Sequence, residues 1–395
     1  MWKKVNLRSI TKKTFQWKPT KEPRDSFYYI DVSSVSNETF SIKKLQKINA
    51  TSAPGRARKI VKWEDTIYAT IRPSLKRIAY ISNEYDDQIA STAFCVIRPD
   101  RNKAFPLYIY YSLLSDSINS KIIELQHGAS YPAVTDKDIL NQFVHLPSLK
   151  EQEKIAAILL KIQQAIEVQE SIIEAAQELK KSTMQHVFTY GLRGERTKET
   201  EIGRVPESWL LKPAIEVFTL TSGKTRPENI ADRKNHETKY PVYGGNGVMG
   251  YSTKFFLSSK ALVLGRVGEY CGAVHISHDK SWITDNALYS KEWLDSGTSI
   301  DYVALYLTFF DLNKLKRRSS QPLISQSIVY QQKIPIPDNQ EQQKIVNILK
   351  SIDNKIKLHI GKKSGLHDLF KTVLNKLMTG EVIVKDLDIN FSEVV

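Results

Sequence analysis

The sequence lacks most features that mark a secreted, membrane-bound or metal-binding protein. Only two of its 395 residues are cysteines, Cys95 and Cys271, which are too few and too far apart for a disulfide framework or a zinc site. No apolar run approaches the roughly 20 residues that cross a bilayer. The basic N-terminus lacks the apolar segment of a secretory signal. These absences favour a protein of the reducing cytoplasm.

The motifs of common catalytic sites are also missing. Gly223-Lys224-Thr225 resembles the end of a phosphate-binding loop, but Phe218 stands where that loop needs its first glycine. The segment 245–250 matches G-x-G-x-x-G, yet it follows no buried strand and precedes no predicted helix, so we interpret it as a turn that lets backbone approach a ligand. The chain has no Asn-Pro-Pro-aromatic motif of amino-methyltransferases, no His/Cys cluster and no acidic metal-binding motif of a nuclease. We therefore expect no catalytic, cofactor-binding or metal-binding residue.

What the sequence does have is basic charge in two separate blocks. The net charge is +14. Residues 1–146 carry an excess of nine positive charges and residues 204–336 an excess of five, whereas the segments that follow each are nearly neutral. This division favours an acidic partner, although charge alone does not identify it.

The chain also contains an internal repeat. Leu146–Ile155 (LPSLKEQEKI) aligns with Ile336–Ile345 (IPDNQEQQKI) at a shift of 190 residues, and the alignment continues without a gap to Thr379. Upstream, a shift of 194 pairs Arg72 with Arg266 and Tyr108 with Tyr302. Each copy is a globular block followed by a helical block, which is the pattern of a duplicated unit.

The helical blocks, 147–190 and 337–380, each begin with a proline and a capping-box spacing, Ser148 with Glu151 and Asp338 with Glu341. Apolar residues then recur every three or four positions, as in a coiled-coil seam. A helix of this length measures roughly 60 Å at 1.5 Å per residue. We expect the two helices to pair antiparallel with pseudo-two-fold symmetry; the alternative is that they are ordinary core helices of two α/β domains. The first stripe comprises Ile155, Ile158, Leu159, Ile162, Ile166, Ile173, Ala176 and Leu179.

Two details of this prediction concern breaks between and within the helices. Gly361 and Gly365 fall inside the second stripe, and we expect a bend or a frayed turn there because glycine weakens helices. Residues 191–206 are rich in glycine and charge and are interpreted as a linker. Residues 381–395 are interpreted as a C-terminal tail.

Both globular blocks, 1–146 and 207–336, are predicted to be mainly β-structure, because they contain short β-branched runs bounded by Gly, Pro, Asn or Asp. One helix is expected in each, at about 107–124 and 302–315. The predicted fold class is therefore α+β: two mainly β blocks separated by two long antiparallel α-helices.

The residue types that remain in these blocks suit nucleic-acid binding. Arginine can bind guanine with two hydrogen bonds and asparagine can bind adenine, while lysine contacts phosphates. For any one of them a solvated surface charge is an equally good interpretation; Arg72 and Arg266 are better candidates because the repeat places them equivalently. The candidate DNA-binding residues are Arg56, Arg58, Lys59, Arg72, Lys76, Arg77, Lys224, Arg226, Tyr243, Asn246, Arg266, Arg317 and Arg318.

Several stretches resemble the specificity subunits of type I restriction–modification systems. The segment 184–209 resembles the family's passage from its central conserved helix into the second recognition domain. Tyr240–Gly247 (YPVYGGNG) and Leu264–Gly272 (LGRVGEYCG) resemble motifs of recognition domains, and Leu374–Glu381 (LNKLMTGE) resembles the end of the distal helix. The first block departs most, since it lacks the glycine-rich versions of these loops.

The resemblance implies that each block is a target-recognition domain for one half of a bipartite double-stranded DNA target, with the helices fixing the gap. It further implies two adenine-methylating modification subunits as partners, carrying S-adenosylmethionine, together with restriction/translocase subunits. No cofactor is expected on this chain. The rival interpretations are the specificity module of a type IIB-like system, an autonomous DNA-binding regulator, and a catalytic nuclease.

Overall fold

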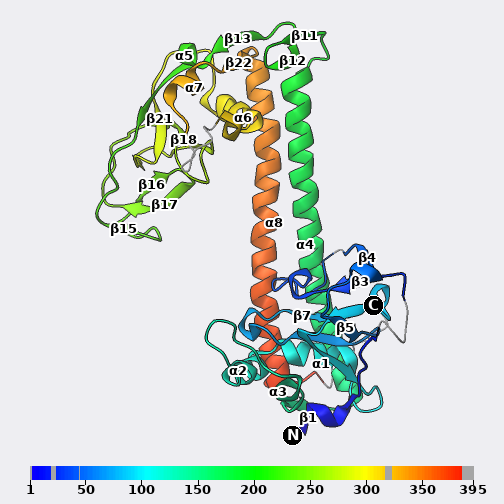
Figure 1. Cartoon of the computed structure of the whole chain (residues 1–395). Helices are drawn as coiled ribbons and strands as arrows, with labels where there is room; N and C mark the ends of the chain where they lie inside the picture. Colours follow the sequence, from blue (N-terminus) through cyan, green and yellow to red (C-terminus); the bar gives the residue numbers. More distant parts are fainter. Residues whose placement is uncertain (1, 19–23, 44, 316–322, 385–395) are drawn as a thin grey trace. The chain divides into compact units, whose positions relative to one another are not determined.

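The computed structural model describes residues 2–18, 24–43, 45–315 and 323–384. It divides into two compact units, one formed by residues 1–172 with 359–395 and the other by residues 173–358. Both boundaries fall within the two long helices, α4 (Leu149–Tyr190) and α8 (Asn339–Thr379), which Figure 1 shows in green and orange. Each unit therefore contains one globular block and one segment of each long helix.

The strand pairs of the first block are antiparallel except for one parallel pair, between β3 (Ser26–Ile30) and β8 (Ile89–Ser91) of the second sheet. A short pair joins β1 (Lys3–Asn6) to β10 (Phe143–Leu146) at the start of α4. The first sheet has the order β2 (Thr11–Lys12), β9 (Phe94–Pro99), β6 (Thr66–Ala69), β7 (Ile78–Tyr80). The second sheet has the order β4 (Lys47–Asn49), β3 (Ser26–Ile30), β8 (Ile89–Ser91), β5 (Ala57–Ile60). The helices of this block are α1 (Pro106–Leu114), α2 (Asp116–Glu124) and α3 (Asp136–Leu140).

The second block has matching elements. Strands β13 (Leu210–Pro213) and β22 (Lys333–Ile336) form the short pair. The first sheet has the order β14 (Phe218–Ser222), β21 (Ala287–Trp293), β18 (Leu262–Gly265), β19 (Val274–Ile276). The second sheet has the order β15 (Ile230–Ala231), β17 (Gly247–Ser252), β16 (Tyr240–Gly244), β20 (Trp282–Ile283). The helices are α5 (Ala214–Val217), α6 (Ile300–Phe310) and α7 (Gln326–Tyr330).

The two blocks share the topology of their first sheet and the three-strand order β4-β3-β8 and β17-β16-β20 of their second, which confirms the internal repeat and the α+β fold class. The fourth strand of the second sheet differs, because β5 lies beside β8 whereas β15 lies beside β17. In each block the first sheet places the first strand, the last strand and then the central hairpin in the same order, and every pair is antiparallel. The predicted helices are present, although residues 107–124 form two helices, α1 and α2, that meet at Ser115.

The repeated glutamine and tyrosine have structural roles that explain their pairing. Gln152 accepts a hydrogen bond from the Phe105 amide (2.8 Å) at the start of α1, and Gln342 accepts one from the Ser299 amide (2.8 Å) at the start of α6. Tyr302 donates to the carbonyl of Pro335 on β22 (2.6 Å), and Tyr108 donates in the same way to β10. These bonds fix each long helix to the block that precedes it.

The long helices run antiparallel within each unit. In the first unit Gln169 contacts His359 (2.8 Å), and Tyr111 lies against both Gln163 and Phe370. In the second unit Lys180 pairs with Asp353 (2.7 Å), and the Leu192 amide donates to Glu341 (2.7 Å). Residue numbers rise along α4 as they fall along α8, as the coiled-coil prediction requires.

Two predicted details of the helices differ in the structure. Leu179, assigned to the seam, is 56% exposed, and its neighbour Lys180 takes the inward position instead. No frayed turn occurs at Gly361 or Gly365, because α8 continues as α-helix through both residues. The intrinsic cost of about 1 kcal/mol per glycine is smaller than what the packing of the rest of a 41-residue helix supplies.

The helix starts are only partly as predicted. The cap bonds are present, because the Glu151 amide donates to Ser148 Oγ (3.4 Å) and the Glu341 amide to Asp338 Oδ1 (3.0 Å). The Glu341 carboxylate, however, is buried and accepts from the Leu192 amide and from Trp209 Nε1 (3.3 Å). It therefore ties the chain that leaves α4 to the start of α8.

The segment 191–206, interpreted as a linker, contains a hairpin of β11 (Thr197–Thr200) and β12 (Gly203–Pro206). Gly191 begins it at φ +67°, and a Cβ there would lie 2.9 Å from Glu341 Oε1, so only glycine fits without displacing that carboxylate. Within the described residues, no helix combines the length and apolarity needed to cross a membrane. Of the predicted tail, residues 385–395 lie outside the described residues.

Candidate nucleic-acid interfaces

In the second block, four loops meet at one edge of the sheets. They are residues 223–226, 245–246, 266–270 and 285–286. The Asp285 amide donates to the Lys224 carbonyl (3.0 Å), and the Arg266 amide donates to the Asn286 carbonyl (3.0 Å). We name these four segments the second-block loop cluster.

The glycines of this cluster allow the loops to approach one another. A Cβ on Gly265 would lie 2.2 Å from the Tyr270 carbonyl oxygen and 2.5 Å from that of Gly245. Backbone atoms cannot move aside as a flexible side chain can, so glycine is required there. The glycine-rich motifs of this block therefore hold the cluster together, as backbone packing rather than as a dinucleotide site.

The structure brings four predicted residues into the cluster. Lys224, Arg226 and Asn246 are exposed, and Asn246 lies at the turn between β16 and β17. The Lys224 ammonium lies 4.6 Å from the centre of the Phe256 ring. Arg266 is half-buried and donates from Nη1 to Ser222 Oγ (2.9 Å), which fixes one side of its guanidinium.

Four other exposed residues of this cluster were not among the predicted DNA-binding residues. The pair 269–270 lies in the Leu264–Gly272 motif, at the tip of the loop after β18, whereas the only signal of the polar pair 285–286 is its position directly before β21. Carboxylates and amides can accept from cytosine or bind adenine, so they add to the cluster's hydrogen-bonding range. The missed residues are Glu269, Tyr270, Asp285 and Asn286.

Tyr243, also a candidate, is a core residue. Its side chain is 3% exposed, and its hydroxyl lies 2.6 Å from His278 Nδ1. Burial raises the pKa of Tyr243. Its hydroxyl holds β16 against residue 278, so this geometry indicates a structural role. Arg317 and Arg318 lie outside the described residues.

In the first block, only part of the predicted basic cluster faces solvent. Arg56 is exposed, and its carbonyl accepts the Thr92 amide (2.8 Å), two residues before β9. Lys224 and Asp285 make the same contact two residues before β21. The repeat therefore presents a basic residue at a corresponding place in both blocks.

Two neighbours of Arg56 are held by the protein itself. Lys59 is buried and pairs with Asp136 at the start of α3. Arg58 is half-buried and donates from Nη1 to the Ala57 carbonyl (2.9 Å). A buried ammonium requires its partner, so Lys59 fits a structural ion pair better than a phosphate contact.

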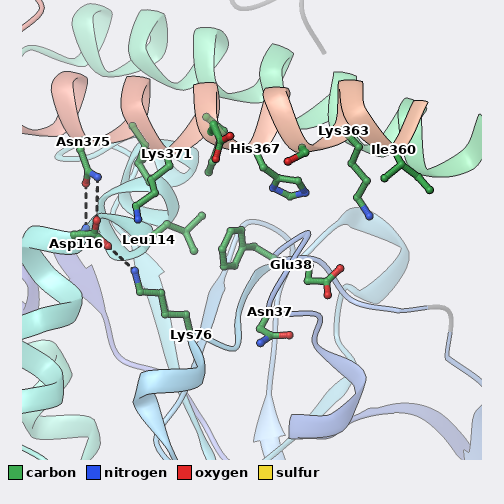
Figure 2. A pocket seen from close by; sticks show the side chains of 15 residues that line it. Asn37, Glu38, Lys76, Leu114, Asp116, Ile360, Lys363, His367, Lys371 and Asn375 are labelled. Carbon is green, nitrogen blue, oxygen red and sulfur yellow. Dashed lines mark hydrogen bonds and ion pairs between the residues drawn. The ribbon is translucent and has the colours of Figure 1, made fainter. Parts of the chain in front are cut away.

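The connection between β6 and β7 holds the last three candidates, of which two are bonded internally. Lys76 Nζ lies 2.6 Å from Asp116 Oδ1, and Asn375 Nδ2 on α8 donates to Asp116 Oδ2 (3.0 Å), as Figure 2 shows. The hydrogen bond from Lys76 lowers the pKa of Asp116. Arg77 donates to the carbonyls of Val32 and Val35. Arg72 is exposed at the tip.

A cavity of about 530 Å³ opens beside Lys76, between this connection and α8 (Figure 2). Phe40, Leu114 and Phe370 form apolar parts of its lining, and charged groups of both signs surround them. Burial and the nearby Lys363 lower the pKa of His367, which faces this cavity, and so favour its neutral form. Within the described part of the chain, no three His, Cys, Asp or Glu side chains are grouped as a metal site.

Comparisons with known proteins agree with this architecture. The family model described as "Type I restriction modification DNA specificity domain" matches residues 1–178 and 206–367. Two relatives come from Methanocaldococcus jannaschii. The type I restriction enzyme MjaVIII specificity subunit is 27% identical over 71% of each chain, and the putative type I restriction enzyme MjaX specificity subunit is 23% identical over 97% of this chain and 94% of that one.

Solved structures show the same fold. The S subunit of the type I system of M. genitalium matches over 96% of both chains with a TM-score of 0.65 and 16% identity. A chain from a study of complex assembly and conformational transition of the type I R-M system matches over 96% of this chain and 98% of that one, with a TM-score of 0.59 and 24% identity. Since the family model covers both repeats, the chain belongs to the family of type I restriction–modification DNA specificity subunits.

Proposed function

We propose that each globular block reads one half of a bipartite double-stranded DNA target. The observation that carries this is the repeated sheet, in which each block presents an exposed basic residue whose carbonyl accepts the amide two positions before an inner strand. Residues 1–146 would form the first target-recognition domain and residues 207–336 the second. Two related readers joined in one chain fit a target with two unlike halves better than a single continuous site.

The long helices, 147–190 and 337–380, would set the spacing between the half-sites and bind two modification subunits. In this proposal the chain contributes recognition, the adenine methylation belongs to partners that carry S-adenosylmethionine, and restriction/translocase subunits complete the assembly. This assignment of recognition to the chain and of catalysis to its partners fits the polar loops, which offer the hydrogen-bond donors, acceptors and charges used in direct base readout. The buried free cysteines are compatible with the reducing cytoplasm.

Single-molecule mapping of N6-methyladenine tests the proposal. The chain is co-expressed with the methyltransferase encoded beside it, in a host without other adenine methylation. We expect one split motif, methylated in each half, that appears only when this chain is present. An active methyltransferase that yields no split motif would contradict the proposal, and tight sequence-specific binding by the isolated chain would then favour an autonomous regulator.

A matched pair of lysines tests the second-block loop cluster. Lys224→Ala removes a cluster cation, whereas Lys291→Ala removes an exposed lysine farther along β21. A lost phosphate contact lowers affinity and reduces the slope of log affinity against log salt by about one. We expect that change for Lys224→Ala alone; equal effects of both variants would remove the cluster from the interface.

A further inference from the structure

The connection between β6 and β7 in the first block is held in an unusual backbone conformation. Arg72 (φ 49°, ψ 59°) and Lys76 (φ 47°, ψ 46°) are both left-handed and flank the single 3₁₀ turn Pro73–Leu75. Left-handed conformations are unfavourable for residues other than glycine and persist where surrounding contacts determine them, often at ligand-binding sites. Two left-handed residues in one five-residue loop therefore make this loop a candidate binding site.

Both ends of this loop are anchored. At one end the Arg72 amide donates to the Pro132 carbonyl (2.7 Å), and Ile71 bridges to Ala133. At the other end Lys76 pairs with Asp116, which in turn is bonded to α8 through Asn375. The tip therefore has little freedom, although it lies at the surface.

At the tip of this loop, the side chain of Arg72 lies over the aromatic ring of Tyr131. The Arg72 guanidinium lies 5.4 Å from the centre of the Tyr131 ring, within cation–π range. Tyr131 is 72% exposed, the most exposed of the large hydrophobic side chains in the described residues. A ring beneath a guanidinium restrains its position while its N–H groups can still donate outward, and bidentate hydrogen bonding to guanine requires two such groups.

We propose that Arg72 reads a guanine in the half-site bound by the first block and that Tyr131 positions it. The inference rests on the proposed DNA-reading function. The repeat aligns Gln321 with Tyr131, so the second half-site would be read without such a pair. Tyr131 acts as a positioning residue, because its ring orients the group that contacts the base.

The test uses the whole complex and reads the methylation motif of five variants. Arg72→Lys keeps the charge but loses the bidentate edge, and lysine is sterically acceptable because Lys76 adopts the same conformation in this loop. Tyr131→Ala removes the platform, and Tyr131→Phe keeps the ring. Arg72→Asn also suits the left-handed region. Phe143→Ala is the matched control, since Lys4 lies 5.4 Å over that exposed ring in the same block.

We expect Arg72→Lys, Arg72→Asn and Tyr131→Ala to lower discrimination at one guanine of one half-site by roughly five- to a hundredfold. The other half-site should be unchanged, which shows that the complex still assembles. Tyr131→Phe and Phe143→Ala should keep the wild-type motif. The inference is overturned if Arg72→Lys retains the motif, if only the salt dependence changes, or if the affected half contains no guanine. A wild-type chain that yields no split motif would instead refute the underlying function.

Discussion

Removing the Gln342 carboxamide should destabilise the second unit strongly. Gln342 is 1% exposed, and its side chain makes three hydrogen bonds: from the Ser299 amide (2.8 Å), and to the carbonyls of Gly297 (3.0 Å) and Pro337 (2.9 Å). Gln342→Ala leaves these backbone groups without that partner. Each buried group left unsatisfied costs about 1–3 kcal/mol. Because Gly297 is exposed and its carbonyl can bond solvent instead, we expect a total loss of about 2–4 kcal/mol in the free energy of unfolding.

The neighbouring residue supplies the control. Gln343 is exposed, and within the described residues its side chain bonds only Asn347 Oδ1 (2.9 Å) on the same helix face, so Gln343→Ala should cost less than about 0.5 kcal/mol. Urea unfolding gives the free-energy difference, and hydrogen exchange locates it. The first turn of α6, at whose start Gln342 accepts the Ser299 amide, should lose protection in Gln342→Ala alone. Equal stability of the two variants would refute the assignment of Gln342 as the bond between α8 and α6.

Three further predictions concern the Glu341 carboxylate, the half-buried His275 and the long helices. Glu341→Gln should lower the free energy of unfolding by about 1–2 kcal/mol, because a neutral amide replaces a carboxylate that accepts hydrogen bonds from Leu192 and Trp209. Trp209 fluorescence should report the unfolding. Glu151→Gln, at the aligned and less buried position, should change stability little, and equal effects of the two variants would argue against this role of Glu341. Burial lowers the pKa of His275, whose Nε2 has no hydrogen-bond partner within the described residues. The neutral imidazole therefore contributes stability above the unfolded pKa of about 6.5, and this contribution is lost as the pH falls through the lower folded pKa. The free energy of unfolding of His275→Gln should therefore fall less than that of the wild type between pH 7 and 5, and parallel curves would contradict this. Inserting one helical turn, four residues or about 6 Å, into both α4 and α8 should lengthen the spacer of the methylation motif by roughly two base pairs; altered half-sites with an unchanged spacer would refute the ruler proposal.

Much of the fold could be predicted because it is repeated. The alignment of Gln152 with Gln342 and of Tyr108 with Tyr302 placed equivalent residues correctly, and the structure shows that each pair makes the same contact. Leu179 was misplaced because the seam continues through Lys180, whose charge is neutralised by Asp353 on the other helix. A partner far away in the sequence decided that position, and periodicity alone cannot reveal it.

The candidate site was predicted less well, since residue type does not reveal whether a charge is already satisfied. Lys59, Lys76 and Arg77 appear as a basic patch in the sequence, yet each is bonded to a carboxylate or to backbone carbonyls. Tyr131 was missed because a single exposed aromatic carries no sequence signal. Its significance comes from Arg72, which is 59 positions away in the chain and lies over its ring.

Exchange of one block tests the central claim most directly. Residues 207–336 are replaced by the corresponding block of a specificity subunit with a known, different target, and the methylation motif of the chimera is mapped in the assembled complex. The account predicts that one half of the motif changes to that of the donor, while the other half and the spacer stay as they were. A change in both halves, or in neither, would contradict the claim that each block reads its own half-site.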